Sequence, residues 1–370
     1  MNNEQFDPNL LVSILMLFVL FIFSALLIQK GRKKYSSRML LLYFLGQIVV
    51  IGGNVISNTT PFGIRSFLFV HPVIYTWAAS FYLYIASLLN PSFRLKGRHI
   101  VHLVPAITVL VYIVITYYSK DPATRMDLIE KQGYAFKVYG MFQYIFNAQI
   151  IAYNIAALVK FRNYLTNYKE EYSVLDKPSN FWIKLSIFGF FAACMIVQVS
   201  IYSRTHQLWP AVNWYLTGNL AFLLFFTILF YVAILNPVVI VPVSASEKSR
   251  RSPVMADEAR KLAELLDTYM ETKQPYRKST ISLKDLAEET GIQERHLSQV
   301  INEIKKQNFF DYINSYRVRA TMELLSNPEH KQRKMFDILF DSGFNSKTTF
   351  NAAFKKYTGL TPSEYRNNQF

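Results

Sequence analysis

The sequence predicts an all-α protein in two parts, a seven-helix transmembrane domain followed by a smaller soluble domain of two helix-turn-helix units. Of the 370 residues, 51% are hydrophobic, which is more than a typical soluble protein contains. Long apolar stretches fill the first two-thirds of the chain, and a repeated helix–glycine–helix pattern lies near its end. We expect residues 10–243 to form the transmembrane domain and residues 276–370 to form the soluble domain.

The transmembrane domain is predicted from seven apolar stretches, each long enough to cross about 30 Å of hydrocarbon as a helix and none with an acidic residue. They are approximately Leu10–Ile28, Met39–Ile56, Phe67–Leu89, Ile100–Tyr118, Val138–Val159, Ile183–Tyr202 and Val212–Leu235. The second and fifth are the weakest because they carry Asn54, Asn147, Gln149 and Asn154. A count that differs by one is therefore the alternative.

The first apolar stretch is predicted to be a membrane span and not a signal peptide. Residues 1–10 contain no basic side chain, and the apolar run that follows is 19 residues long. A secretory signal peptide has a basic start and a shorter apolar run. We therefore expect residues 1–9 to form a short extracytoplasmic N-terminus.

Basic residues in the loops predict the orientation of the spans. With the N-terminus outside, the inner loops together with Lys184 at the start of the sixth stretch carry 13 Lys and Arg residues, and the outer loops carry 6. Cytoplasmic loops are enriched in basic residues, so this asymmetry favours an extracytoplasmic N-terminus. Seven spans then place the C-terminal domain in the cytoplasm.

The net charge of +15 does not by itself predict a nucleic-acid partner. Residues 244–370 carry 21 Lys and Arg against 17 Asp and Glu, a net charge of +4, whereas residues 1–243 have a net charge of +11. Most of the excess belongs to the loops between spans. An argument for DNA binding must therefore come from the motifs.

Residues 244–275 are predicted to connect the two parts. The segment SASEKSRRSP, residues 244–253, is polar and basic, as expected beside anionic membrane lipid headgroups. Residues 255–270 are predicted to form a helix with one apolar side, made of Ala259, Leu262, Leu265, Leu266 and Met270. We expect this stripe to pack against the soluble domain, and a homodimer seam is the alternative.

The first helix-turn-helix unit is predicted from Ser282 to Asn302. Ser282 followed by Asp285 fits an N-cap with a capping box, and Gly291 suits a turn that needs positive φ. The second helix has an apolar side and leaves Arg295, Ser298, Gln299 and Asn302 outside, where they could hydrogen-bond to base edges or phosphates. Two core-forming helices with a polar surface are the alternative.

A second copy of the plan runs from Asp337 to Gly359. Gly343 is expected to make the turn, 52 residues after Gly291, and Ser346 to cap the second helix. The stretch between the two copies, Phe309 to Leu325, is predicted to be one helix of about 25 Å. Such a helix could hold two recognition helices in successive major grooves, about 34 Å apart.

The stretches LAEETGIQERHLSQVINE, FFDYINSYRV and GFNSKTTFNAAFKKYTGLTPSEYR resemble the DNA-binding domain of the AraC/XylS family of bacterial transcription regulators. The last stretch is similar to the family's C-terminal signature almost letter for letter. The resemblance implies sequence-specific binding to double-stranded DNA and a bacterial protein in the cytoplasmic membrane.

The resemblance also implies roles for particular residues. It makes Glu294–Ile304 and Lys347–Lys356 the two recognition helices. Its base-reading positions fall on Arg295, Ser298 and Gln299 in the first helix and on Lys347, Thr348 and Asn351 in the second. Its phosphate-contacting positions fall on Arg317, Lys355 and Lys356. The sequence departs from the family at Leu339, where a small residue is usual, and at Ala352, where many members have a longer polar residue.

No catalytic or cofactor-binding pattern is found. GxSxG, HExxH and phosphate-binding Gly-rich motifs are missing from the sequence. The single cysteine excludes an intrachain disulfide and a thiolate metal cluster, and His99 with His102 supplies too few ligands for a metal site. We therefore expect no enzyme activity, no cofactor and no bound metal.

Two functions are compatible with these observations. The first is a membrane-embedded one-component transcription regulator, whose membrane domain senses an unidentified signal or ligand. The alternative is a transporter or receptor-like membrane protein whose C-terminal domain binds a protein partner. The polar outer faces of the two recognition helices favour the first.

Overall fold

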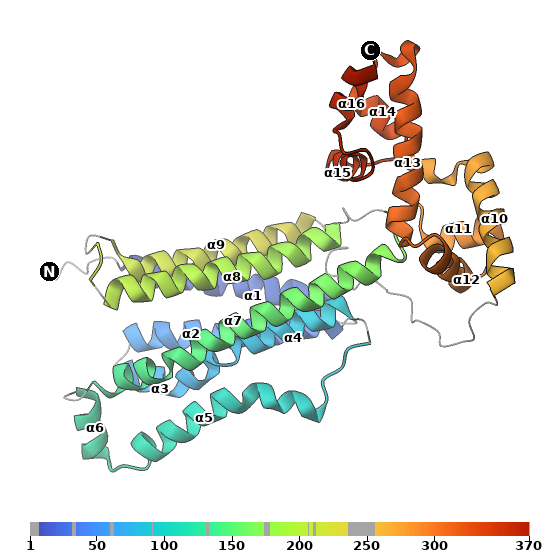
Figure 1. The fold of residues 1–370 in the computed structure, drawn as a ribbon. Helices are drawn as coiled ribbons and strands as arrows, with labels where there is room; N and C mark the ends of the chain where they lie inside the picture. The colour runs from blue at the N-terminus through green and yellow to red at the C-terminus, as the bar shows by residue number, and fades with distance from the viewer. Residues whose placement is uncertain are drawn as a thin grey trace. The chain divides into compact units, whose positions relative to one another are not determined.

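The computed structural model describes residues 7–31, 35–59, 63–90, 92–130, 133–173, 178–205, 207–209, 212–235 and 256–369. Within these residues the regular elements are all helices, apart from one isolated bridge (Figure 1). The chain separates into two compact units, residues 1–161 with 181–244 and residues 162–180 with 245–370. Most of the expected N-terminal tail and the basic linker at 244–253 lie outside the described residues.

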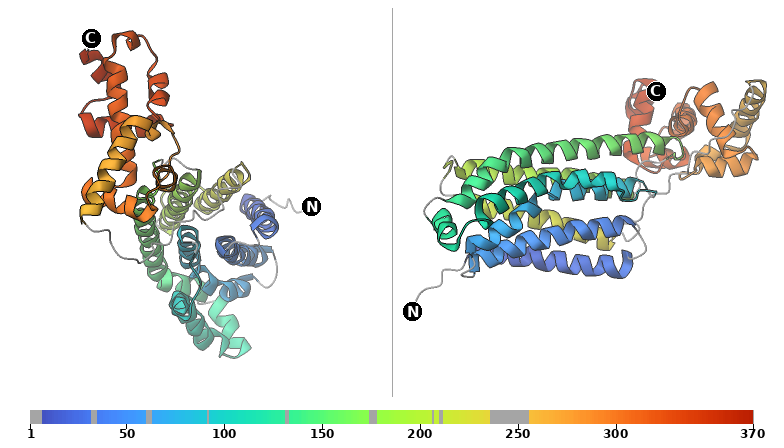
Figure 2. Two further views of the ribbon diagram at one scale, coloured as in Figure 1. Left: turned by 90° about the vertical axis from the view of Figure 1, so that its right-hand side faces the viewer. Right: turned by 90° about the horizontal axis from the view of Figure 1, so that it is seen from below.

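The first unit is a bundle of long apolar helices, which run side by side in both views of Figure 2. Its elements are α1 (Pro8–Gly31), α2 (Tyr35–Thr59), α3 (Gly63–Ile74), α4 (Trp77–Leu89), η1 (Gly97–Leu103), α5 (Val104–Ile113), η2 (Val114–Tyr118), α6 (Pro122–Glu130), α7 (Tyr134–Lys169), α8 (Pro178–Thr205) and α9 (Trp214–Leu235). Seven helical stretches of the described residues are long and apolar enough to cross a membrane. Each overlaps one of the seven stretches predicted from the sequence.

Three of these stretches differ from the continuous α-helices that apolarity alone predicts. The third is divided into α3, which ends at Ile74, and α4, which begins at Trp77. Between them the Tyr75 amide donates to the Pro72 carbonyl at 3.2 Å, and the Thr76 amide donates to the Val73 carbonyl at 3.0 Å, as in tight turns. The fourth begins as the 3-10 helix η1 and ends as the π turn η2, on either side of α5. The fifth, α7, continues ten residues beyond Val159 and ends at Lys169.

The second unit consists of short helices around one long helix. Its elements are α10 (Ala256–Lys273), η4 (Pro275–Arg277), α11 (Leu283–Thr290), α12 (Glu294–Gln299), η5 (Val300–Ile304), α13 (Phe309–Ser326), η6 (Pro328–His330), α14 (Met335–Asp341), α15 (Lys347–Thr358) and α16 (Pro362–Gln369). It also includes the last turns of α7 and the residues that follow them. The architecture predicted from the sequence is therefore observed.

Helix α13 contributes side chains to both hydrophobic cores of the second compact unit. It is one helix of 18 residues, as predicted, and spans about 27 Å. Phe309, Ile313 and Ala320 belong to a core shared with α10, α11 and α12, whereas Val318 and Leu325 belong to a second core shared with α14 and α15. Each helix-turn-helix unit thus has its own core, and the two cores share one rigid helix.

The apolar stripe of α10 packs against the first of these cores, as expected. Ala259, Leu266 and Met270 are buried in it, and Leu262 packs against it. Leu265 is the exception, because 48% of its surface is exposed. An ion pair of 2.5 Å between Lys305 and Asp267 also ties α10 to the end of η5.

Candidate nucleic-acid interface

The first helix-turn-helix unit begins with the predicted capping box. The Ser282 hydroxyl accepts a hydrogen bond from the Asp285 amide at 3.2 Å, and the Ser282 amide donates to the Asp285 carboxylate at 2.9 Å. Gly291 makes the turn with a φ of +70°. These local predictions are confirmed: the capping box begins α11, and Gly291 ends it before the turn to α12.

The first recognition helix is α12 followed by the π-helical turn η5, which together cover the predicted range Glu294–Ile304. Leu297, Val300 and Ile301 are buried on its inner side. Arg295, Ser298 and Gln299 are half-buried on the other side. A single π turn widens the helix and shifts the side chains that follow it, so the C-terminal half faces a different direction from a regular α-helix.

Side chains on the outer face of this helix bond to one another. Gln299 donates to the Glu303 carboxylate at 2.9 Å, and Asn302 donates to the Ser298 hydroxyl at 3.3 Å. Two of the three predicted base-reading residues are therefore held in place by neighbours one turn further on. These bonds would have to open or rearrange for Ser298 or Gln299 to read a base.

The second helix-turn-helix unit repeats the geometry with fewer constraints. Ser346 caps α15 by accepting from the Thr349 amide at 3.1 Å, as predicted, and Gly343 makes the turn with a φ of +88°. Phe350, Ala353 and Phe354 are buried against the core. All three predicted base-reading residues, Lys347, Thr348 and Asn351, are exposed in the first two turns of α15. This is the half of a recognition helix that enters the major groove.

The two departures from the family pattern have clear places. Leu339 is 2% exposed and fills the second core, so the larger side chain is accommodated inside it. Ala352 is exposed on α15, beside Asn351. Its methyl group can make apolar contact but no hydrogen bond to a base.

Arg317 contradicts the expectation that it contacts a DNA phosphate. Its side chain is 1% exposed and lies inside the domain. The guanidinium donates to the carbonyl oxygens of Tyr276 at 2.9 Å, Lys278 at 3.0 Å and Ser279 at 3.1 Å. Burial lowers the pKa of Arg317 to about 10, which leaves it protonated at neutral pH. Arg317 is therefore a structural residue that satisfies buried carbonyls, and the sequence pattern alone could not show its direction.

The other two predicted phosphate-contacting residues lie on the surface. Lys355 is exposed near the C-terminal end of α15. Lys356 is 57% exposed and forms an ion pair of 2.8 Å with Asp311 at the start of α13. An exposed ion pair of this kind is worth little in water, so a phosphate could compete for the Lys356 ammonium group.

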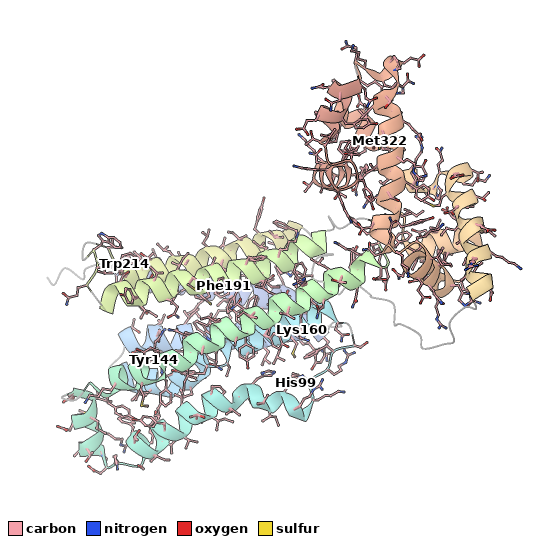
Figure 3. All side chains as sticks on the ribbon, in the orientation of Figure 1. His99, Tyr144, Lys160, Phe191, Trp214 and Met322 are labelled. Carbon is pink, nitrogen blue, oxygen red and sulfur yellow. The ribbon has the colours of Figure 1, made fainter. Side chains whose placement is uncertain are left out.

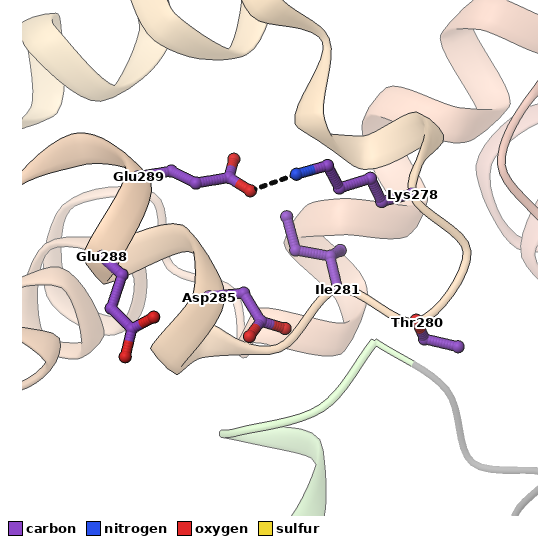
Figure 4. A pocket seen from close by; sticks show the side chains of 6 residues that line it. All are labelled: Lys278, Thr280, Ile281, Asp285, Glu288 and Glu289. Carbon is purple, nitrogen blue, oxygen red and sulfur yellow. Dashed lines mark hydrogen bonds and ion pairs between the residues drawn. The ribbon is translucent and has the colours of Figure 1, made fainter.

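A pocket with mainly acidic side chains lies where the chain enters α11 of the first helix-turn-helix unit (Figure 4). It is lined by Lys278, Thr280, Ile281, Asp285, Glu288 and Glu289. Its single lysine is already paired with Glu289, whose hydrogen bond and charge raise the pKa of Lys278. Lys284 also pairs with Glu288 at 3.7 Å. Three carboxylates against these two lysines still leave a net negative charge that repels phosphate, so the pocket does not extend the candidate DNA surface.

One contact of the first helix-turn-helix unit was not predicted from the sequence. Residues Glu170–Ser173, which follow α7, lie against the beginning of α11 and the end of the first recognition helix. The Leu283 amide donates to the Glu171 carbonyl at 2.9 Å, and Asn302 donates to the Glu170 carboxylate at 2.6 Å. More than a hundred residues separate the two sides of this contact, so no local pattern could reveal it.

Comparison with known proteins agrees with this geometry. Residues 286–368 match the model of a family described as a helix-turn-helix domain. This part of the chain is a helix-turn-helix domain. The match starts inside α11 and ends inside α16, so it includes both recognition helices and α13. Arg317 and the predicted base-reading residues all lie within it.

Proteins similar to this domain are described as transcription regulators. An uncharacterized HTH-type transcriptional regulator of Staphylococcus aureus (strain COL) is 33% identical over 87 residues, which are 23% of this chain and 11% of that protein. The melibiose operon regulatory protein of Escherichia coli (strain K12) is 26% identical over 86 residues, or 28% of its own length. No solved structure matches the chain.

These relatives are similar to this chain over the helix-turn-helix domain and not over their whole lengths. The chain spans between about a tenth and less than a third of the relatives it matches. The similarity therefore supports the nature of the C-terminal domain. It carries no information about the apolar helices of the first unit.

Proposed function

We propose that this protein is a membrane-embedded transcription regulator of the AraC/XylS type, which binds double-stranded DNA with two helix-turn-helix units. The observation that carries the proposal is the second unit: a family-matched recognition helix with Lys347, Thr348 and Asn351 exposed at its N-terminal end. Polar side chains at this position of a recognition helix contact base edges in the major groove. We assign base reading in the first unit to Arg295, Ser298 and Gln299.

The single helix between the two units supports simultaneous binding by both. Helix α13 spans about 27 Å and contributes to both cores, so both recognition helices pack around the same helix. Successive major grooves on one DNA face are about 34 Å apart. Lys355 and Lys356 on α15 would position the second unit through phosphate contacts.

Membrane embedding is supported by what the first unit exposes. Large apolar side chains cover the outside of its helices, including Phe18 with 62% of its surface exposed and Leu224 with 61%. Tyr144 and Phe191, labelled in Figure 3, belong to the same outer surface. Water does not favour so much contiguous apolar surface, whereas lipid does. The excess of basic residues in alternate loops supports an extracytoplasmic N-terminus and a cytoplasmic DNA-binding domain.

The membrane unit would then act as the sensor. A signal or ligand that changes the arrangement of its helices would change the affinity of the C-terminal domain for its DNA site. The combination of a helix bundle and a DNA-binding domain in one chain supports this role. A fixed membrane anchor without a sensory role would have the same combination. The reporter assay described below distinguishes a sensor from an anchor.

Selection of DNA from a randomised pool by the full chain in lipid nanodiscs tests the proposal. We expect an enriched sequence with two protected major-groove patches about one helical turn apart. We also expect the affinity to fall steeply as the salt concentration rises. Failure of the full chain and of the variants described below to enrich any sequence would contradict the proposal and favour a protein partner for the domain.

A reporter gene carrying the enriched site tests sensing. We expect substitutions inside the membrane bundle to change reporter expression while the amount of protein in the membrane stays constant. The interhelical hydrogen bond of 2.8 Å between Gln143 and Gln198 is a suitable place, and Gln198→Leu removes it. Unchanged expression across a set of such variants would indicate an anchor without a sensory role.

A further inference from the structure

The residues that follow α7 form a short strap on the DNA-binding domain, which we define as Glu170–Ser173. Tyr172 forms an isolated antiparallel bridge with Ser282, the N-cap residue of α11. Next to it, the Leu283 amide donates to the Glu171 carbonyl at 2.9 Å, and the Ser173 hydroxyl donates to the Ile281 carbonyl at 2.5 Å. The strap is therefore attached to the first helix-turn-helix unit mainly through backbone atoms.

Side chains of α13 contact the chain at both ends of the strap. Ser173 is 1% exposed, and the Arg317 guanidinium donates to its carbonyl oxygen and to its hydroxyl, both at 3.4 Å. At the other end, the Lys169 ammonium group lies over the Phe310 ring, 5.6 Å from its centre. Arg317 and Phe310 both belong to α13. The strap therefore contacts the helix that supports both units as well as α11.

The strap also contacts the predicted DNA-reading face. The side-chain amide of Asn302 donates to the Glu170 carboxylate at 2.6 Å and to the Ser298 hydroxyl at 3.3 Å. Ser298 and Asn302 are four residues apart and lie on one face of the recognition helix. Glu170 thus places a carboxylate one turn from a base-reading residue. DNA carries a dense row of negative phosphates, so a carboxylate at this position opposes its approach.

We propose that the strap is an autoinhibitory element, which keeps the first recognition helix from DNA until movement of α7 withdraws it. This inference rests on the proposed function. Helix α7 runs without a break from Tyr134 to Lys169, and its residues from Gly140 are apolar enough to cross a membrane. Glu170 follows its last residue directly. A rotation or shift of α7 would therefore act on the strap, because Glu170 is the next residue of the chain.

Removal of the Glu170 side chain tests the charge and the hydrogen bond. We expect Glu170→Ala in the full chain to bind the selected DNA on the order of tenfold more tightly, a usual size for coupling between sites. Glu170→Gln removes the charge and keeps a hydrogen-bond acceptor for Asn302, so its gain should be smaller. The matched control is Glu264→Ala on the exposed side of α10, which makes the same charge change away from the strap and should leave affinity unchanged.

A reversible cross-link tests the strap by fixing it to α11, and comparison of the oxidised and reduced forms cancels the loss of the Ser282 cap and of the Tyr172 ring. Tyr172 and Ser282 are a non-hydrogen-bonded antiparallel pair, for which Cα atoms lie about 4.5 Å apart, within the range that a disulfide requires. We would make Tyr172→Cys and Ser282→Cys in a Cys194→Ser background, since Cys194 is the chain's single cysteine. Oxidation should produce a cross-linked monomer that binds DNA more weakly than the wild-type chain. Reduction of the same sample should restore binding and serves as its own control.

The outcomes separate this inference from the proposed function. If the wild-type chain binds a specific site and neither the Glu170 substitutions nor the cross-link changes its affinity, the strap is not inhibitory although the protein is a regulator. Weaker binding by Glu170→Ala, or stronger binding by the oxidised form, would overturn the inference in the same way. If no form of the chain binds any specific DNA, the proposed function and the inference both fail.

Discussion

The two helix-turn-helix units have the same plan and very different surroundings. In the first, Gln299 and Ser298 are engaged by Glu303 and Asn302, and the strap lies over the end of the recognition helix. In the second, Lys347, Thr348 and Asn351 are exposed. The first recognition helix also changes to a π turn after Gln299, whereas α15 is a regular helix of 12 residues.

This difference teaches that a repeated motif need not make equal contributions to binding. In the second helix-turn-helix unit the predicted base-reading side chains are exposed. In the first, side chains of the recognition helix are hydrogen-bonded to one another and to the strap. The two are joined by α13 and by Arg317, whose guanidinium lies 5.7 Å from the Phe344 ring of the second unit while it donates to carbonyls beside the first. Each prediction below changes one unit and compares it with the other.

The largest expected effect is the loss of Arg317, which joins the units. Arg317→Met keeps much of the side-chain volume but leaves the carbonyls of Tyr276, Lys278 and Ser279 without their buried donor. We expect the free energy of unfolding of the second compact unit to fall by about 4 kcal/mol. Hydrogen exchange of its amides measures this, and both cores should be affected.

The matched control is Arg319→Met on the same helix. Arg319 is exposed and lies over the Tyr316 ring at 4.6 Å, an arrangement worth only about 0.5 to 1 kcal/mol at the surface. A loss as small for Arg317→Met as for Arg319→Met would show that the buried hydrogen bonds do not support the domain.

The two turn glycines are expected to differ more than their positions in the motif suggest. A Cβ at Gly343 would lie 2.3 Å from the Tyr276 carbonyl oxygen and 2.8 Å from the Arg277 Cα, whereas a Cβ at Gly291 meets nothing within 4 Å. We expect Gly343→Ala to destabilise its unit by about 3 kcal/mol, from backbone strain and overpacking together. Gly291→Ala should cost only the strain, about 1 kcal/mol.

Thermal unfolding of the full-length variants measures this difference. Equal shifts in Tm for the two alanine variants would mean that the segment Tyr276–Arg277 does not pack closely on the turn of the second unit. The sequence predicts positive φ at both glycines and gives no sign of the close approach at Gly343.

Local features were predicted more reliably than contacts between distant parts of the chain. The capping box at Ser282, the cap at Ser346 and the extent of α13 depend on residues within a few turns, and all three are confirmed. The direction of Arg317 depends on carbonyls some forty residues away, which no periodicity records. Its position within the family motif indicated a phosphate contact, and burial overturned that interpretation.

The same limit applies to the apolar helices of the first compact unit, residues 1–161 with 181–244. Apolar length was sufficient to locate all seven stretches, because it is a property of each stretch alone. It did not reveal that α7 continues to Lys169 or that the next residues pair with Ser282. The candidate base-reading residues stay a prediction, since exposure on a recognition helix is necessary for base reading and is not sufficient.

DNA binding should depend more on the second unit than on the first while the strap is in place. Each lost base contact costs about 1 to 3 kcal/mol, and we expect Lys347→Ala to lose about 2 kcal/mol of binding free energy in the full chain. Arg295→Ala should lose clearly less. In the Glu170→Ala background, however, the two losses should become more similar, because the carboxylate beside the first recognition helix, which opposes DNA, is then absent.

Titration of the selected DNA site with the four variants and their two parent chains measures these losses at one fixed salt concentration, since phosphate contacts make affinity strongly salt-dependent. Lys284→Ala supplies a control, because this exposed lysine lies on α11 outside the recognition helix. An Arg295→Ala loss that equals the Lys347→Ala loss in the wild-type chain would contradict the unequal use of the two units.

The smallest expected effect concerns the two caps, and it separates the side chain of Ser282 from its backbone. Ser282→Ala and Ser346→Ala each remove one capping hydrogen bond and should each destabilise their own helix by about 1 kcal/mol, measured by hydrogen exchange in α11 and α15. Replacement by Asp, which also caps helices, should restore most of the loss. The strap is joined to this region through the Leu283 amide and the Ile281 carbonyl, so it should remain attached in Ser282→Ala. A gain in DNA affinity for Ser282→Ala but not for Ser346→Ala would instead mean that attachment of the strap depends on the Ser282 cap. The stability of α11 would then determine how tightly the strap binds the first helix-turn-helix unit.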